Sequence, residues 1–65
     1  MTERERIGKR IAELREAHNV SQKGLAEAIG THQGNIARLE AGKYNAGFDT
    51  LQAIASFFEM QIDFI

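Results

Sequence analysis

The chain contains no cysteine, no proline and no tryptophan. Without cysteine, disulfide bonds and thiolate metal sites are excluded. The two histidines, His18 and His32, lie too far apart in the sequence to suggest a metal site, and no cofactor is expected. Because proline is absent and the six glycines are scattered, we find no linker, repeat or low-complexity segment.

The chain also lacks any run of about twenty apolar residues that would span a bilayer, and it has no signal-peptide pattern. We therefore expect a soluble, unprocessed, cytoplasmic protein. Residues 1–65 are enough for one small domain, close to the size at which a single core barely suffices, so a partner subunit is expected to add stability. The net charge of −1 gives no general attraction for nucleic acid, so any DNA binding must rest on local charge.

Apolar residues recur at helical spacing near both ends of the chain. Thr2 and Glu5 have capping-box spacing, and Asn19 is a plausible left-handed residue after the first helix. Phe48 resembles a hydrophobic staple, followed by Asp49 and Gln52 as a second capping box. The inward residues are Ile7, Ile11 and Leu14 in the first helix and Leu51, Ile54, Ala55 and Phe58 in the last. Acidic and basic residues interleave on the rest of the first helix, which is typical of a solvated face.

Segment 21–40 predicts two short helices joined by a tight turn. Ser21 caps the first, which runs to about Ile29, and the second spans about Gln33 to Leu39. Gly30 between them suits a positive φ, and Ala26 sits where the two helices would cross. The inward positions are Leu25, Ile29, Ile36 and Leu39. This is the geometry of a helix-turn-helix, whose second helix has an outer face that can enter a DNA groove.

The tail changes period, because Met60, Ile62 and Phe64 alternate with polar residues as in a half-buried strand. Since no other segment has the pattern of a strand, we expect this strand to pair with the same segment of a second copy, which would make a homodimer. The alternative is that residues 60–65 continue the helix or pack on the core. The predicted fold is all-α, with four to five helices and a dimerisation tail at residues 57–65. Its predicted interface residues are Phe57, Phe58, Met60, Ile62 and Phe64.

Leu25, Ala26, Gly30, Ile36 and Leu39 resemble the helix-turn-helix of the Cro and phage-repressor (XRE) family. The resemblance covers about residues 5–60, with further matches at Arg15, Gln22, the run 39–43 and the segment 50–55. The chain departs from the family at Ala46, where proline is usual, and at Gly24 and Gly34, which weaken their helices by about 1 kcal/mol each relative to alanine. The tail is similar to that of a branch that includes repressors of toxin–antitoxin operons.

The resemblance implies a recognition helix in the major groove. Its predicted base-reading residues are Gln33, Gly34, Asn35 and Arg38. Glutamine can pair with adenine and arginine with guanine, whereas Gly34 has no side chain to read a base. The predicted phosphate contacts are Gln22, Lys23, His32, Lys43 and Asn45. For His32 a capping or solvent-facing role competes, and Tyr44 either packs or reaches a phosphate. Arg15 and Glu40 resemble a family ion pair that ties the first helix to the end of the third.

These residues predict a homodimeric, sequence-specific regulator of transcription that binds an inverted repeat in double-stranded DNA, most simply as a repressor. The alternative is an antitoxin or adaptor whose main partner is a toxin or another protein, favoured by the near-neutral charge, Gly34 and the apolar tail. An enzyme is not expected, because the sequence shows no nucleophile paired with a base, no paired carboxylates and no phosphate-binding loop.

Overall fold

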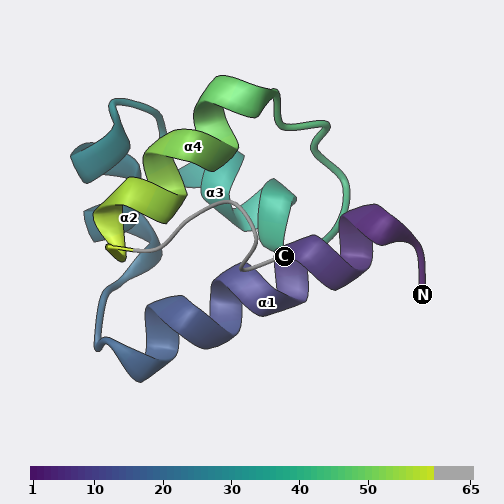
Figure 1. Cartoon of the computed structure of the whole chain (residues 1–65), viewed down its shortest axis with the longest axis horizontal. Coiled ribbons are helices and arrows are strands. Elements are labelled where there is room, and N and C mark those ends of the chain that lie inside the picture. The colour runs from purple at the N-terminus through teal and green to yellow at the C-terminus, as the bar shows by residue number, and fades with distance from the viewer. Residues whose placement is uncertain (60–65) are drawn as a thin grey trace.

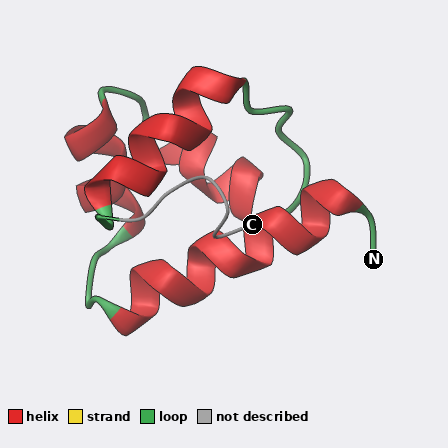
Figure 2. Ribbon diagram, in the orientation of Figure 1, coloured by secondary structure: helices red, strands yellow, loops and turns green. Residues whose placement is uncertain are grey.

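Four helices make up the part of the chain that the computed structural model describes, residues 1–59. They are α1 (Glu3–Ala17), α2 (Gln22–Ile29), α3 (Gln33–Glu40) and α4 (Phe48–Phe57). No strand occurs within residues 1–59, as Figure 2 shows. The all-α prediction is confirmed. The predicted strand and its residues Met60, Ile62 and Phe64 lie outside the described range.

Helix α3 lies between two other helices. It packs against α2 across the helix-turn-helix and against α1 on another side, while α4 packs against α2. In Figure 1, α1 runs along the lower edge of the molecule and α4 crosses above it. This arrangement leaves the remaining side of α3 open to solvent, which is why its outer residues are available to a ligand.

The core draws on all four helices. Ile11, Leu25, Ile36 and Ile54, one residue from each helix, are at most 1% exposed. Around them lie Leu14, Ala26, Leu39, Ala55 and Phe58, which are also buried. Ala26 is 1% exposed, as expected for a small residue at the crossing of α2 and α3. Because burial of apolar surface is the main favourable term in folding, these residues fix how the four helices pack.

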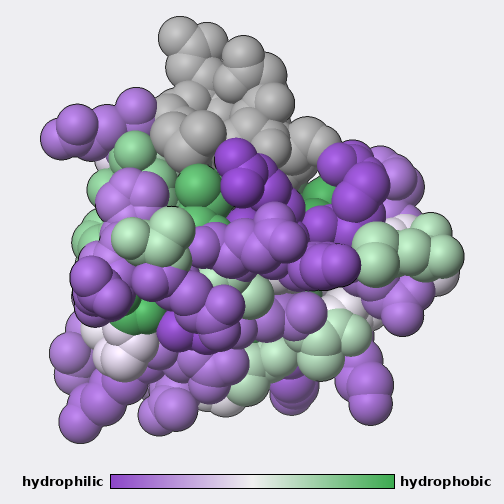
Figure 3. All heavy atoms as spheres, turned by 90° about the horizontal axis from the view of Figure 1, so that it is seen from below, coloured by the Kyte–Doolittle hydropathy of each residue, from purple (hydrophilic) through white to green (hydrophobic). Residues whose placement is uncertain are grey.

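The charged residues of α1 face solvent. Glu3, Arg4, Glu5, Lys9 and Glu13 are all exposed. Figure 3, seen from the side of α1, shows a surface that is mostly hydrophilic. The predicted solvated face is therefore present. It holds the Arg6–Glu3 ion pair, whose Nη2 and Oε1 atoms are 2.7 Å apart, and the carboxyl of Glu3 has a lowered pKa because Arg6 donates hydrogen bonds to it.

The first three helices differ in how their first turns are capped. Helices α1 and α2 begin with a side-chain capping bond, whereas α3 does not. Thr2 and Glu5 form the predicted capping box: the Glu5 backbone N–H donates to Thr2 Oγ1 at 3.1 Å, and the Thr2 N–H donates to Glu5 Oε1 at 2.8 Å. The bond from the Thr2 N–H lowers the pKa of the Glu5 carboxyl. Ser21 Oγ accepts from the Gly24 N–H at 2.9 Å, so the predicted cap of α2 is also confirmed. His32 occupies the cap position of α3, but its side chain makes no capping bond.

Helices α1 and α2 end in the same backbone motif. Asn19 and Gly30 follow them with φ of 56° and 79°. The next residue in each case, Val20 or Thr31, donates its N–H to a carbonyl five residues back, at 3.0 and 2.9 Å. This is the Schellman motif, which satisfies carbonyls left free at a helix end. Both predicted left-handed residues are confirmed. The motif at Gly30 forms the turn between α2 and α3.

The prediction for the start of α4 was wrong. The helix begins at Phe48 with Gly47 as its cap and has no side-chain capping bond. Asp49 therefore lies inside the first turn, where its charge complements the helix dipole instead of capping. Phe48 is 68% exposed and does not act as a staple.

Phe58 was predicted both as a core residue of the last helix and as a residue of a dimer interface, and its burial fits the first role. It is 7% exposed and packs in the core of the monomer, as its helical spacing indicated, so its side chain is not part of a free apolar face. Its ring contacts those of Phe57 and His18, each with centroids 5.0 Å apart. Phe57 is 38% exposed and remains a candidate for contact with a second copy.

Gly8 allows α1 to lie directly on the end of α3. A Cβ atom at this position would meet the Leu39 carbonyl oxygen and would lie 2.8 Å from that of Glu40. Both obstacles are backbone atoms, so neither can turn away as a side chain can. The close approach of the two helices therefore requires a residue without a Cβ. Sequence reasoning missed this, because a lone glycine inside a helix gives no signal of what lies opposite.

We expect Gly8→Ala to destabilise the fold by about 2–3 kcal/mol, because the added methyl forces α1 away from α3. The matched control is Gly34→Ala, where an added Cβ meets nothing within 4 Å and the better helix former is expected to stabilise by up to about 1 kcal/mol. Urea unfolding followed by circular dichroism measures both. Equal stability of the two variants would contradict the close contact at Gly8.

Candidate nucleic-acid interface

Helix α3 has one buried and one open face. Ile36 and Leu39 point into the core, whereas Gln33, Gly34 and Arg38 are exposed. Asn35 lies between the two faces and is half-buried. Three of the four residues predicted to read bases therefore share the open side of one short helix, and the apolar residues of the same helix hold that side outward.

A chain of polar contacts crosses the open face of α3. Asn35 Nδ2 donates to Thr31 Oγ1 at 2.9 Å, and Arg38 Nη2 makes a long contact of 3.5 Å with Asn35 Oδ1. The Arg38 guanidinium carbon also lies over the ring of Tyr44, 5.6 Å from its centroid. The structure thus joins two predicted base-reading residues to Tyr44, for which the sequence did not decide between packing and phosphate contact.

The carboxylate of Glu40, at the end of α3, accepts hydrogen bonds from two other helices. Arg15 Nε donates to Oε2 at 2.7 Å, and Arg15 Nη2 donates to Oε1 at 3.1 Å. Gln22 Nε2 donates to the same Oε1 at 3.0 Å. The side chains of Arg15 and Glu40 are only 13% and 9% exposed, so the pair is shielded from solvent. The structure places the predicted ion pair together and adds Gln22 to it.

Arg15 is fixed at both ends of its guanidinium. Its Nη1 donates to the Val20 carbonyl at 2.9 Å, beside the two bonds to Glu40. The bond to Glu40 raises the pKa of Arg15, so the arginine stays charged at every accessible pH. Because Val20 leads into α2, this one side chain connects the end of α1, the start of α2 and the end of α3.

Gln22 makes a contact with Glu40 that the sequence did not reveal. Its amide nitrogen carries two hydrogens, and the bond to Glu40 uses one of them. The other remains available to an acceptor at the start of α2, where the helix N-terminus also favours an anion. The contact with Glu40 thus holds the Gln22 amide in place without removing its ability to donate to a phosphate.

The other predicted phosphate contacts come from three places in or beside the helix-turn-helix. Lys23 belongs to the first turn of α2, while Lys43 and Asn45 belong to the loop after α3, and all three are exposed. His32 is exposed at the start of α3.

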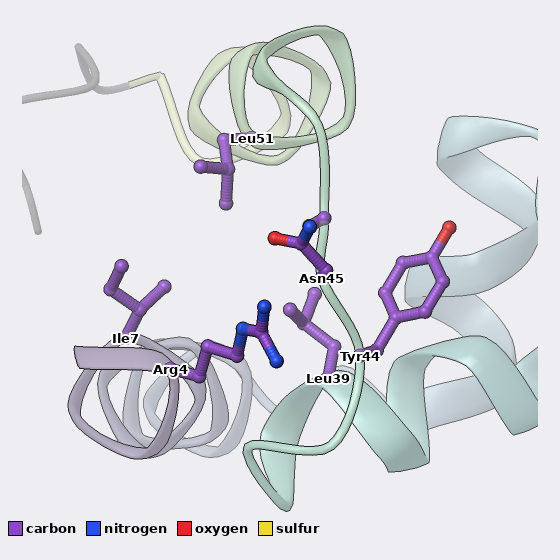
Figure 4. A pocket seen from close by; sticks show the side chains of 7 residues that line it. Arg4, Ile7, Leu39, Tyr44, Asn45 and Leu51 are labelled. Carbon is purple, nitrogen blue, oxygen red and sulfur yellow. The ribbon is translucent and has the colours of Figure 1, made fainter. Parts of the chain in front are cut away.

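A shallow hollow of about 70 Å³ opens beside the loop after α3. Its lining residues are Arg4, Ile7, Leu39, Tyr44, Asn45, Ala46 and Leu51. In Figure 4 the side chains of Arg4 and Asn45 face each other across it, while the Tyr44 ring lies on the other side of the loop. Arg4 thus adds a cation near Asn45. Sequence reasoning missed it, because Arg4 belongs to the charged face of α1 and only the fold brings the loop beside it.

Comparison with known proteins agrees with this geometry. The sequence model of a helix-turn-helix family, HTH_3, matches residues 11–65. The chain belongs to the helix-turn-helix family. It is a transcriptional regulator of the XRE type with a DNA-binding fold, and the regulators of this family bind double-stranded DNA. A relative from Archaeoglobus fulgidus, named as an uncharacterized HTH-type transcriptional regulator, is 38% identical over 54 residues, which are 83% of this chain and 76% of the relative.

Two solved structures resemble this helix-turn-helix regulator. The restriction-modification controller protein C.AhdI from Aeromonas hydrophila superposes with a TM-score of 0.88 at 25% identity, over 92% of this chain and 91% of C.AhdI. PlcR from Bacillus thuringiensis, solved with the peptide PapR7 and DNA, gives 0.83 at 34% identity, over 91% of this chain but only 21% of PlcR. The likeness to PlcR thus covers one part of a larger protein.

Within residues 1–59 of this regulator, no helix is long and apolar enough to cross a membrane. Within the same range, no group of three or more histidine, aspartate or glutamate side chains has the geometry to hold a metal ion.

We expect Glu40→Gln to destabilise the regulator by about 1–3 kcal/mol, because Arg15 would keep its charge in a shielded site without its anion. The control is Glu3→Gln, which removes the carboxylate of a solvent-exposed ion pair of the same type and is expected to leave the midpoint of thermal unfolding nearly unchanged. Differential scanning calorimetry compares them. Similar small shifts for both variants would mean that Glu40 does not hold the helices together.

Proposed function

We propose that this regulator is a cytoplasmic homodimeric repressor that binds an inverted-repeat operator through the major groove. The observation that carries the proposal is the open face of α3, where Gln33 and Arg38 are exposed on a helix whose other face is fixed in the core. Residues 21–40 form the helix-turn-helix within one domain of residues 1–65. Two such helices in a dimer would enter successive major grooves about 34 Å apart.

Only a few side chains of α3 would contact the DNA bases and so recognise their sequence. Gln33 can pair with the N6 and N7 atoms of adenine, and Arg38 with the O6 and N7 atoms of guanine. An added Cβ at Gly34 would meet nothing within 4 Å, so the α3 backbone has open space on its outer side and can come close to the bases. With so few reading groups per subunit, one copy discriminates poorly, and a dimer that binds two half-sites gains selectivity from both.

Phosphate contacts would position the dimer without reading sequence. Gln22 and Lys23 serve one end of the helix-turn-helix, and Lys43 and Asn45 the other, with His32 and Arg4 beside them. The exposure of the lysines and the free N–H of Gln22 support this assignment. Because the whole chain carries a net charge of −1, the local cations around α3 must supply the attraction for DNA.

We expect Arg38→Ala and Lys43→Ala to weaken DNA binding in different ways. Loss of Arg38 should relax the preference at one position of each half-site, whereas loss of Lys43 should weaken all sequences alike. Lys43→Ala should also lower the slope of log K against log salt by about two per dimer, one for each lost lysine. Selection from random duplexes, followed by binding titrations at several salt concentrations, measures both effects.

Failure of the wild-type protein to enrich any palindromic sequence at low salt would overturn the proposed function. Uniform losses on every sequence from both variants would overturn the separate roles of Arg38 and Lys43. A gene for a toxin beside this one, together with a tight complex between the two proteins, would favour the antitoxin alternative.

The partly exposed ring of Phe57 supports a dimer that buries the end of α4. We expect Phe57→Glu to shift the protein from dimer to monomer, because a carboxylate cannot be buried unpaired at an apolar interface. Phe48→Glu is the matched control, since Phe48 is more exposed and lies at the other end of α4. Sedimentation equilibrium at micromolar concentration gives the masses. A monomeric wild-type protein would contradict both the dimer and the two-half-site operator.

A further inference from the structure

We propose that Tyr44 and Asn35 are positioning residues that hold Arg38 in the conformation that reads a guanine. The inference rests on the proposed function, because it assigns Arg38 to a base. It adds that sequence preference at this base depends on a tyrosine in the loop after α3. It also changes the role predicted for Asn35, from reading a base to orienting the residue that does.

The first observation is the contact of the Arg38 guanidinium with an aromatic ring. Arg38 is exposed at the surface of α3, and a free arginine side chain there would sample many rotamers. Its guanidinium carbon lies 5.6 Å from the centroid of the Tyr44 ring, within the range of a cation–π contact. A ring beneath the guanidinium carbon does not use the N–H groups of Arg38, and these are the groups that would pair with guanine.

The second observation is the direction of the Asn35 amide. Its Nδ2 donates to Thr31 Oγ1 at 2.9 Å, which turns its oxygen toward Arg38 Nη2, 3.5 Å away. Both polar atoms of Asn35 therefore have partners within the protein. Arg38 has five N–H donors and this contact engages one nitrogen, so its other donors remain available to a base.

The third observation is that the loop carrying Tyr44 is itself attached to α3. The Lys43 backbone N–H donates to the Arg38 carbonyl at 2.9 Å, one residue before Tyr44. Tyr44 is half-buried and packs against the core, and Figure 4 shows its ring across the loop from Arg4 and Ile7. The ring is thus held against the same helix whose arginine it contacts.

The binding test compares three variants with the wild-type protein on the duplex selected by the wild type and on a scrambled duplex. Tyr44→Leu keeps an apolar side chain but removes the ring, Tyr44→Phe keeps the ring, and Phe48→Leu removes an exposed ring elsewhere. We expect Tyr44→Leu to weaken binding to the selected duplex about three- to tenfold and to flatten the preference at the base that Arg38→Ala also relaxes. Binding to the scrambled duplex should not change, and Tyr44→Phe and Phe48→Leu should behave as wild type.

A second measurement needs no DNA and covers the case in which Tyr44→Leu fails to fold. The Arg38 guanidinium lies over the Tyr44 ring, so a ring-current effect on the side-chain protons of Arg38 is expected from that ring. In the free wild-type protein, the side-chain protons of Arg38 should show upfield NMR shifts, and Tyr44→Phe should retain them. Random-coil shifts for Arg38 would overturn the proposal whatever the DNA assays give.

The two proposals fail in different ways. If the wild-type protein selects no sequence, the proposed function falls and the positioning role falls with it. If the wild type selects a palindrome but Tyr44→Leu keeps the full preference, or weakens the selected and scrambled duplexes equally, the positioning role alone is overturned. Loss of preference at the Arg38 base only, with Tyr44→Phe unaffected, supports it.

Discussion

The arrangement of the helix-turn-helix depends on one carboxylate. Glu40 ends α3 and accepts hydrogen bonds from Arg15 of α1 and Gln22 of α2, so three helices meet at one side chain. A charge so shielded from water is costly unless every bond to it is made, and removal of a single partner leaves the rest unsatisfied. The network therefore has one good geometry. That geometry sets the angle at which α3 presents Gln33 and Arg38, and it neutralises an acidic group that would otherwise repel DNA.

This network is possible because α1 comes unusually close to α3. Gly8 leaves room for the carbonyls of Leu39 and Glu40, which places Arg15, two turns further along α1, beside the Glu40 carboxylate. Ile11 lies between Gly8 and Arg15 on the same face of α1 and packs in the core with Ile36 and Ile54. In so small a domain, packing and polar contacts cannot be separated, because the same few helices supply both.

The surface that results has little excess charge and few groups able to read a base. Arg38 is the exposed cation of α3, and its contacts with Tyr44 and Asn35 order a side chain that would otherwise lose entropy on binding. In the proposed mode of binding, the lysines around α3 would supply attraction without specificity. In that mode the protein would need accurate placement of each reading group and a second copy, and the contacts of α3 would provide the placement.

The sequence by itself determined the features that depend on residues close together in the chain. The helical periods, the caps at Thr2 and Ser21, and the left-handed ends at Asn19 and Gly30 were all predicted, because each involves residues within one or two turns. The prediction for the start of α4 was wrong because the cap residue, Gly47, has no side chain that could mark the position in the sequence. The Arg15–Glu40 pair came from the family resemblance, not from any local pattern. Only the tertiary structure decided the contacts of Gly8, Gln22 and Tyr44, since these depend on the distances and angles between helices.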